Sequence, residues 1–318
     1  MKALITGCAG FAGSHLAEYL LDQSEEVIAL VRPNEELENI RQIEGHLQIS
    51  RGDLRDFDFL LEVLKSFRPQ RIYHLAALSS PSESRESPDL TYQVNFTGTL
   101  NLLSAWLRVG MDCRFLLVGS SEVYGRVPPE KLPMREGMEL RPGSPYAGSK
   151  AAAEILALQF FQSYGLPIVR VRPFNHTGPR QSSNFVCSKF ARQAAEIDLG
   201  LRPPTIVAGN LQAIRDFSDV RDIVRGYHDL LEMGTPGEVF QLCSGRPVSI
   251  ETILQTVISF TSKPVQTLID KSLIRDQEAA EVWGDYSRAK LAVGWEPRRA
   301  LADTLRELKS YWEARSGS

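Results

Sequence analysis

Two side chains with the right chemistry to exchange a proton with a substrate lie four residues apart, at Tyr146 and Lys150. On a helix this spacing places both on one face. A tyrosine exchanges protons near neutral pH only if its pKa falls from about 10 toward 7, which requires roughly 4 kcal/mol of stabilisation of the phenolate. A nearby positive charge supplies such stabilisation. We therefore expect Tyr146 to act as acid or base, with its pKa lowered by Lys150.

A second polar stretch follows an apolar run that reads as a strand over 115–119. It consists of Ser120, Ser121 and Glu122, and ligands of open α/β sheets bind at the carboxyl ends of strands. We expect the Ser120 hydroxyl to bond the reacting oxygen beside Tyr146 and Ser121 to contact the substrate. A carboxylate such as Glu122 is able to remove a carbon-bound proton. The alternative is that the serines only cap or turn the chain.

The first predicted strand runs directly into a glycine-rich turn. Gly7, Gly10 and Gly13 are spaced as GxxGxxG, with Phe11 and Ala12 at the start of the following helix. Glycines here permit a tight turn, close approach of a pyrophosphate and close helix packing, and the helix start attracts phosphate. The strand–turn–helix context predicts a dinucleotide site, to which Lys150 adds a contact with the nicotinamide ribose.

The end of the second strand distinguishes the two nicotinamide dinucleotides. An acid at this point suits the ribose hydroxyls of NAD, whereas an arginine suits the 2′-phosphate of NADP. The sequence places Arg32 there, so NADP is expected. Glu35 and Glu36 follow closely and keep NAD possible. Asp53 is a candidate contact to the adenine ring, or else a capping residue.

Apolar runs alternate with helical patterns through the first half of the chain. Parallel strands need crossovers, which helices supply, so the order predicts an α/β fold with a Rossmann-type doubly wound parallel sheet. We also expect a smaller C-terminal substrate lobe that is intertwined with the first domain. The expected domains are 1–174 plus 216–248 for NADP, and 175–215 plus 249–318 for the substrate. Expected helices include 91–109, 149–164, 185–200 and 220–232, and a returning strand is expected at 238–243.

Composition excludes several classes of protein. The 318 residues carry a formal net charge of −3 with no basic stripe, so a duplex nucleic-acid binder is not expected. The four cysteines lie far apart, which disfavours disulfides and metal sites and fits a reducing compartment. No apolar run approaches the roughly 18 residues of a membrane span, and the start is unlike a signal peptide. We expect a cytoplasmic protein that binds no metal, nucleic acid or membrane.

Taken together, TGxxGxxG, SSEVYG, YxxxK, Asn95 and the Leu75-Ala76-Ala77 stretch resemble the extended short-chain dehydrogenases/reductases. The resemblance covers nearly the whole chain and implies a catalytic trio of Ser120, Tyr146 and Lys150, with Asn95 positioning the active-site helix. It also implies homodimers packed through the helices at 91–109 and 149–164. Further cofactor contacts implied by the resemblance are Leu54, Leu75, Ala76, Ala77, Asn95, Pro173 and His176.

The second half of the chain contains scattered polar and basic residues suited to a phosphorylated sugar. Lys189, Arg215 and Arg275 are able to neutralise a diphosphate, and Glu278 is able to accept hydrogen bonds from ribose hydroxyls. Asn175 offers both donor and acceptor groups. Each residue taken singly is as well explained as a surface charge. The expected substrate-binding residues are Ser121, Asn175, Lys189, Asn210, Arg215, Arg275 and Glu278.

As a set, RPFNHTGP, FVxxK, GNLxxxRDFxDVRD and the RxxE of Arg275 and Glu278 are similar to the GDP-mannose branch of the family. Within it the pattern resembles the GDP-6-deoxy-4-keto-mannose reductases, because the turn reads Gly-Phe-Ala-Gly and the chain is short. The resemblance implies NAD(P)H-dependent reduction of the C4 ketone of a GDP-6-deoxy-4-hexulose. Glu122 points instead to a GDP-mannose 4,6-dehydratase with this residue as the C5 base. Another nucleotide-sugar epimerase or dehydratase, or a non-enzymatic NADP sensor, stays open.

Overall fold

The larger part of the molecule is built around a seven-stranded sheet, seen in the computed structural model, which describes residues 1–274 and 279–317. Its strand order is β10-β6-β5-β4-β1-β2-β3, and every neighbouring pair is parallel. The order reverses direction between β1 and β4, which is the switch point at which doubly wound sheets bind ligands. The strands are β1 (Lys2–Thr6), β2 (Glu26–Val31), β3 (Leu47–Arg51), β4 (Arg71–His74), β5 (Arg114–Val118), β6 (Ile168–Pro173) and β10 (Val239–Leu242).

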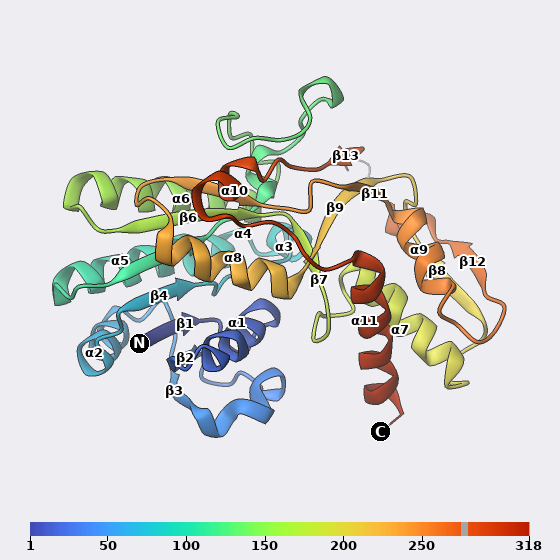
Figure 1. The fold of residues 1–318 in the computed structure, drawn as a ribbon, viewed down its shortest axis with the longest axis horizontal. Coiled ribbons are helices and arrows are strands. Elements are labelled where there is room, and N and C mark those ends of the chain that lie inside the picture. Colours follow the sequence, from blue (N-terminus) through green and yellow to red (C-terminus); the bar gives the residue numbers. More distant parts are fainter. Residues whose placement is uncertain (275–278, 318) are drawn as a thin grey trace.

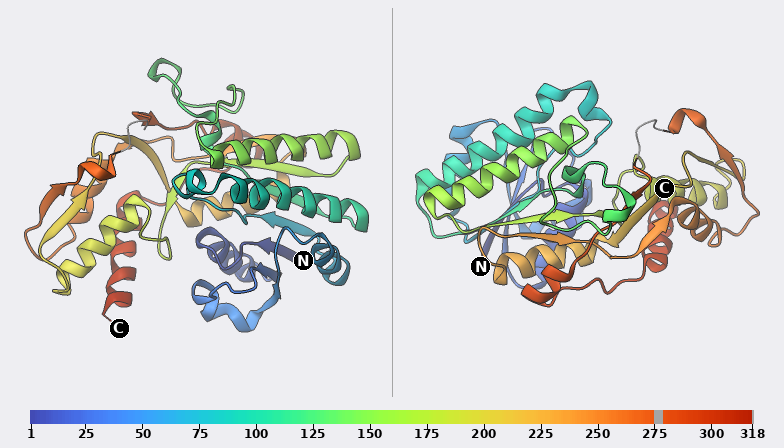
Figure 2. Two further views of the ribbon diagram at one scale, coloured as in Figure 1. Left: turned by 180° about the vertical axis from the view of Figure 1, so that it is seen from behind. Right: turned by 90° about the horizontal axis from the view of Figure 1, so that it is seen from above.

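Helices cover both faces of this sheet, because each helix buries one apolar stripe against it. The helices α1 and α8 share one apolar core with the sheet, and α2, α5 and α6 share the core on the opposite face. Figure 1 and Figure 2 show these two layers from the front and from behind. The expected Rossmann-type α/β fold is therefore confirmed. The helices are α1 (Phe11–Asp22), α2 (Phe57–Phe67), α5 (Gly98–Val109), α6 (Pro145–Tyr164) and α8 (Val220–Met233).

A smaller second lobe lies at one end of the sheet (Figure 1). Its own apolar core joins α7, α9 and α11 with the short strand β8, and the exposed strand β12 pairs with β8. A four-stranded sheet of β7, β9, β11 and β13 lies between this core and the large sheet. The elements are α7 (Val186–Asp198), α9 (Ile250–Ile258), α11 (Leu301–Ser316), β7 (Asn175–Thr177), β8 (Thr205–Ala208), β9 (Ile214–Asp219), β11 (Pro247–Ser249), β12 (Gln266–Ile269) and β13 (Glu281–Val282).

The chain passes between the two lobes more than once. After β9, α8 and β10 return to the large sheet. Helix α10 (Ser287–Val293) also packs on α8, and Trp295 lies in the same core. The expected strand at 238–243 is thus present as β10. The helices α7 and α8 begin and end within two residues of their expected bounds, and α6 ends where expected. That helix begins four residues early because Ser144 caps it and Pro145 fits the first helical position.

One expected helix is interrupted. The stretch predicted as a single helix over 91–109 consists of α4 (Pro88–Tyr92), a π-helical segment (Gln93–Thr97) and α5. A π-turn adds one residue to the helical turn and is common near functional sites. Asn95 lies inside this segment and is buried. A short helix, α3 (Glu83–Glu86), precedes the interruption.

Two negative observations hold for the part of the chain that the structure describes. Its helices include none with the length and apolar character needed to cross a membrane. The same residues contain no cluster of three or more His, Cys, Asp or Glu side chains suited to a metal ion.

Candidate active site

Three glycines allow the backbone to pack closely in the turn between β1 and α1. Gly7 has φ +71°, and a Cβ on Gly13 would stand 2.1 Å from the Gly7 carbonyl oxygen. Gly10 caps the helix, and among the described residues no side chain bonds this end and no acid stands in the first turn. The first backbone N–H groups of α1, from Phe11 and Ala12 onward, therefore face an anion site. These features fit a dinucleotide pyrophosphate.

The end of β2 carries both signs of charge. Arg32 is largely exposed and its guanidinium lies 3.3 Å from the Glu35 carboxylate. The Arg32 backbone N–H also donates to Glu35, and Arg51 holds the loop through the Arg32, Pro33 and Glu35 carbonyls. An arginine suited to a 2′-phosphate and a carboxylate suited to a ribose hydroxyl are thus side by side. The site therefore offers Arg32 for the 2′-phosphate of NADP and Glu35 for a ribose hydroxyl of NAD.

Asp53 and Leu54 follow the neighbouring strand β3. The Asp53 carboxylate pairs with Arg55, whose guanidinium lies 2.6 Å away, and this contact holds the pKa of Asp53 below its usual value. Leu54 is buried against Gly98 of α5. Leu75, Ala76 and Ala77 follow β4 on the other side of β1 and are half-buried. Of these predicted residues, Ala76 packs against Gly7 of the glycine turn.

Tyr146 and Ser120 meet at the carboxyl ends of the central strands. Tyr146 lies in the first turn of α6, and Ser120 follows β5 after Gly119. Burial raises the pKa of Tyr146 to about 12, the nearby Ser120 side chain opposes this, and the negative charge of Glu122 adds to it. The sequence-based expectation of a lowered pKa is therefore wrong for the chain alone, because burial of the hydroxyl exceeds the stabilisation its neighbours provide.

Lys150 lies one turn further along α6 and is also buried. Its ammonium group donates to the Val118 carbonyl oxygen at 2.8 Å, at the end of β5. Burial lowers the pKa of Lys150 to about 8. The expected effect of Lys150 on Tyr146 is not seen: in the described residues the groups that shift the tyrosine are Ser120 and Glu122. The ammonium is held toward the strand end instead.

A buried histidine that the sequence analysis did not single out connects β1 to the helices behind the site. His74 Nδ1 lies 2.8 Å from the Thr6 hydroxyl, and Nε2 lies 2.9 Å from the Thr99 hydroxyl. Thr99 donates its only hydrogen to the Asn95 carbonyl at 2.6 Å, so Thr99 accepts from His74 Nε2–H and Thr6 donates to Nδ1. Burial, and then the charge of Lys150, lowers the pKa of His74 to about 3. The ring is neutral with one tautomer.

Asn95 extends this chain of hydrogen bonds to α6, the helix that carries Tyr146. Its amide bonds Leu78 twice, at 2.8 and 3.1 Å, and donates to the Ser149 hydroxyl at 3.0 Å. Ser149 in turn donates to the Tyr146 carbonyl at 2.8 Å. The strand that begins the cofactor turn and the first turn of α6 are therefore joined by one continuous buried network. This is a physical basis for the predicted positioning role of Asn95.

A buried ion pair holds the other side of α6. Arg172 on β6 bonds the Glu154 carboxylate at 2.5 and 2.9 Å and the Tyr124 hydroxyl at 2.7 Å. Glu154 lies two turns after Tyr146 on α6, and Tyr124 ends the short helix that begins at Ser121. Charges this deeply buried must be paired. The sequence signal for this pair is weak, because an arginine inside a strand reads equally well as an edge residue.

The predicted residues after β6 lie at the junction of the two lobes. Pro173 ends β6, and Asn175 and His176 lie on β7. The His176 ring stacks on Phe11 of the glycine turn, with centroids 5.8 Å apart and planes at 12°. His176 Nδ1 donates to the Phe174 carbonyl at 2.9 Å, and burial lowers the pKa of the ring. His176 is thus brought to the cofactor turn.

The predicted substrate residues are spread along the second lobe. Ser121 is buried next to Ser120, at the end of β5 rather than in the second lobe. Lys189 is half-buried on α7, and the pKa of Asp270 is lowered first by hydrogen bonds from Ser272 and then by the charge of Lys189. Asn210 accepts from the Gln212 backbone at 3.0 Å, and Arg215 on β9 donates to the Ile214 and Ala280 carbonyls. The remaining predicted pair, Arg275 and Glu278, lies outside the described residues.

Comparisons with known proteins agree with this geometry. The family model described as GDP-mannose 4,6 dehydratase matches residues 4–308. The chain is 33% identical to GDP-6-deoxy-D-mannose reductase of Pseudomonas aeruginosa, over 99% of this chain and 98% of that enzyme. It is 31% identical to GDP-mannose 4,6-dehydratase of Yersinia enterocolitica, over 96% of this chain and 92% of that enzyme. Reductase and dehydratases are thus nearly equally similar.

Solved structures give the same result. The structure of RMD from Pseudomonas aeruginosa complexed with NADPH superposes with a TM-score of 0.87 at 33% identity, covering 99% of both chains. UDP-glucose 4-epimerase of Thermus thermophilus in complex with NAD gives 0.86 at 29% identity, over 98% of this chain and 99% of that one. With its family match over most of its length, the chain belongs to the GDP-mannose 4,6-dehydratase family of extended short-chain dehydrogenases/reductases.

Proposed function

We propose that this protein reduces the C4 ketone of a GDP-6-deoxy-4-hexulose, converting GDP-6-deoxy-4-keto-mannose to GDP-D-rhamnose with NADPH. The observation that carries the proposal is the buried Tyr146 side chain at the start of α6, beside Ser120 at the end of β5. Its phenol is protonated at neutral pH and so begins the reaction as the donor that ketone reduction needs. The reductase of Pseudomonas aeruginosa supports the choice of substrate.

The residues of the first lobe divide the work of binding and proton transfer. The turn from Gly7 to Gly13 holds the pyrophosphate, and Arg32 holds the 2′-phosphate, with Glu35 leaving NADH as a weaker alternative. NADPH, when bound, supplies the hydride for the C4 carbon. Ser120 orients the C4 carbonyl, and Tyr146 donates the proton that the oxygen takes up as the alcohol forms. Lys150 contacts the nicotinamide ribose from its place on α6.

The second lobe binds the sugar nucleotide. Lys189 and Arg215 offset the charge of the diphosphate, and Asn175 and Asn210 hydrogen-bond its polar groups. Arg275 and Glu278 complete this set by family resemblance. The corresponding division of the chain is 1–174 plus 216–248 for NADP and 175–215 plus 249–318 for the sugar nucleotide, with α10 as a stretch that crosses back onto α8.

The decisive experiment adds purified protein to GDP-6-deoxy-4-keto-mannose and follows NADPH absorbance. We expect stoichiometric NADPH consumption and a GDP-linked 6-deoxyhexose product. Tyr146→Phe is expected to abolish turnover while NADPH binding stays within a few-fold of wild type, because the ring still packs and only the hydroxyl group is lost. NADPH binding without turnover of any sugar nucleotide would instead identify a cofactor sensor.

A second function, dehydration of GDP-mannose, is favoured by the position of Glu122. Its carboxylate is near enough to the Tyr146 hydroxyl for its charge to raise the tyrosine pKa, and a base at this distance is able to take a proton from C5. Incubation with GDP-mannose and no added reductant separates the two functions. Formation of a 4-keto sugar that is lost in Glu122→Gln would establish the dehydratase.

We also propose a homodimer formed through α4, α5 and α6. Large apolar side chains stand exposed on these helices although nothing in the chain covers them among the described residues. The exposed apolar side chains are Leu90, Tyr92, Leu107, Ile155 and Tyr164. Burying this patch against a second copy of the chain removes apolar surface from water.

A further inference from the structure

A short connection joins the strand β7 to the helix α7 of the second lobe. It consists of residues 178–185, and Arg180 lies in its first turn with φ +74°. A residue with a Cβ pays a conformational cost in this left-handed region, where glycine pays none. An arginine kept at such a position indicates that its side chain has a task.

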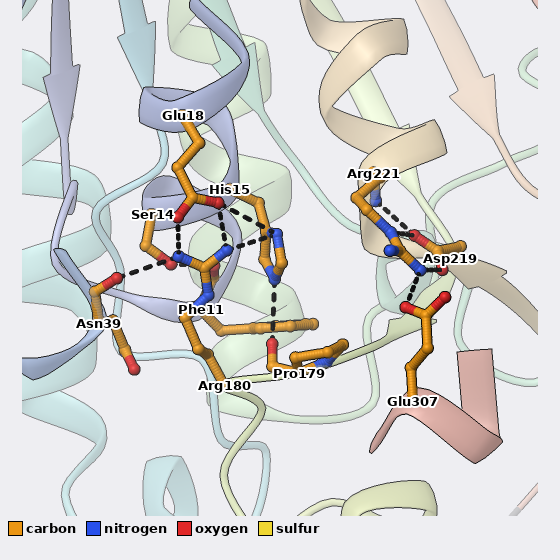
Figure 3. Close-up of polar contacts among 10 residues, drawn as sticks. All are labelled: Phe11, Ser14, His15, Glu18, Asn39, Pro179, Arg180, Asp219, Arg221 and Glu307. Atoms are coloured by element: carbon orange, nitrogen blue, oxygen red, sulfur yellow. Dashed lines mark hydrogen bonds and ion pairs between the residues drawn. The ribbon is translucent and has the colours of Figure 1, made fainter. Parts of the chain in front are cut away.

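The Arg180 side chain reaches across to the cofactor helix. Its guanidinium donates to both Glu18 carboxylate oxygens, at 2.9 and 2.5 Å, and to His15 Nδ1 at 2.7 Å. A further bond, at 3.0 Å, goes to the Asn39 carbonyl in the segment after β2. Figure 3 shows this guanidinium enclosed by groups from α1 and from that segment. The guanidinium is mostly buried, so these charge-assisted bonds are protected from water.

His15 provides a second hydrogen-bonded link between α1 and the connection that carries Arg180. Because its Nδ1 accepts from Arg180, its Nε2 carries the hydrogen and donates to the Pro179 carbonyl at 2.9 Å. Burial, and then the charge of Arg180, lowers the pKa of His15 to about 3, so this pattern holds at neutral pH. The His15 ring also packs edge-on against Phe11, with centroids 5.7 Å apart. Phe11 opens the helix at its phosphate-facing end.

The segment after β2 is tied to the glycine turn as well. The Asn39 amide donates to the Ala9 carbonyl at 3.0 Å, inside the turn, while the Asn39 carbonyl accepts from Arg180. One guanidinium thus holds two parts of the dinucleotide site, the start of α1 and the loop that follows Arg32. We call the set Arg180, His15, Glu18 and Asn39 the α1 clamp.

The other side of the turn is anchored in the second lobe. Gln181 bonds Thr177 at 2.6 Å, and its carbonyl accepts from Ser188 on α7 at 2.7 Å. Ser188 in turn accepts from Trp312 on α11 at 2.9 Å. The α1 clamp therefore has a fixed support outside the Rossmann sheet.

We propose that Arg180, a residue of the substrate-lobe connection, is a positioning residue of the dinucleotide site, acting through the α1 clamp. The inference rests on the proposed function for the identity of the cofactor. Arg180 does not touch the ligand in this scheme. It holds the glycine turn, the first two turns of α1 and the post-β2 loop in the arrangement that binds pyrophosphate and 2′-phosphate.

The test compares two arginines that both have a positive φ. Arg68, at the end of α2, also has positive φ, at +44°, and is exposed. Arg180→Gly and Arg68→Gly both relieve backbone strain, but only the first removes the clamp. The dissociation constant of NADPH is measured by nicotinamide fluorescence, that of GDP by calorimetry, and thermal unfolding is followed for each variant.

For Arg180→Gly we expect the NADPH dissociation constant to rise about tenfold or more, since several charge-assisted bonds are lost, with GDP binding within twofold of wild type. Arg68→Gly is expected to bind both as wild type does. Glu18→Gln is expected to weaken NADPH binding alone, and to add little in the Arg180→Gly background because both changes break one network. None of these readouts requires turnover, so absence of ketone reduction would refute the proposed reaction without touching the clamp.

Two results would overturn the proposal. One is unchanged NADPH affinity in Arg180→Gly. The other is an equal loss of NADPH and GDP affinity together with a lower unfolding temperature, which would show that Arg180 only stabilises the fold.

Discussion

Lys150 is a costly residue to bury, and its replacement by methionine tests that cost. Burial lowers the Lys150 pKa from 10.5 to about 8. A difference of this size corresponds to about 3 kcal/mol of destabilisation of the charged form in the folded state. Methionine fills a similar volume without charge but loses the bond to the Val118 carbonyl, which costs about 1 kcal/mol. At pH 7 we therefore expect Lys150→Met to be more stable by about 2 kcal/mol and inactive.

The sign of the pH dependence follows from the two protonation states. Below pH 8 Lys150 is charged in both the folded and unfolded chains, so the full penalty of burial is present. Between about 8 and 10.5 the unfolded chain keeps a proton that the folded chain has lost, and wild-type stability rises relative to the variant. Above this window both states are neutral. The advantage of Lys150→Met should shrink across the window and end as a small disadvantage.

The assay is urea unfolding followed by tryptophan fluorescence at several pH values, with the difference between wild type and variant plotted so that other titrating groups cancel. Lys65→Met is the matched control, because Lys65 is half-exposed beside Glu62 on α2 and should give a flat difference. A variant that is less stable than wild type at pH 7, or a difference independent of pH, would refute the reasoning that burial sets the Lys150 pKa.

Two further predictions concern the buried network and the dimer. His74→Leu leaves the Thr6 and Thr99 hydroxyls without their partner, so we expect a loss of about 1–3 kcal/mol in unfolding free energy, measured by urea titration; an unchanged midpoint would contradict the network. Ile155→Arg places a charge in the exposed apolar patch of α6 and should halve the mass seen by light scattering, with Leu291→Arg, exposed on α10, as a control that leaves it unchanged.

The features that the sequence predicted are those set by local spacing. The GxxGxxG spacing predicts the glycine turn because it stands between a predicted strand and a predicted helix. The alternation of strands and helices predicts a parallel sheet because each helix connects two parallel strands. Tyr146 and Lys150 share a face of α6 for the same local reason. Ser120 lies near Tyr146 because β5 ends, and α6 begins, at the carboxyl edge of the sheet.

The features that the sequence did not predict depend on what surrounds a residue after folding. The direction of the Tyr146 pKa shift is set by burial, which no spacing encodes. His74 looked like one residue of a strand, and its role became visible only when Thr6 and Thr99 were brought to its two nitrogens. The interruption at 93–97 follows from Asn95 turning inward to bond Leu78 and Ser149. The Arg180 backbone angle likewise requires coordinates.

The raised pKa of Tyr146 bears on the choice between the two proposed reactions. A reductase needs a neutral phenol that gives up its proton as the alkoxide forms, and burial keeps Tyr146 in that state at pH 7. A dehydratase begins by oxidising an alcohol, for which the same residue must first be a phenolate. With a pKa of about 12, forming that phenolate at pH 7 costs about 7 kcal/mol. Ketone reduction meets the same cost at its end, because Tyr146 is left as a phenolate once its proton has been given up. Charges that arrive with the ligands must therefore lower the pKa in either reaction, and only the starting protonation state favours reduction.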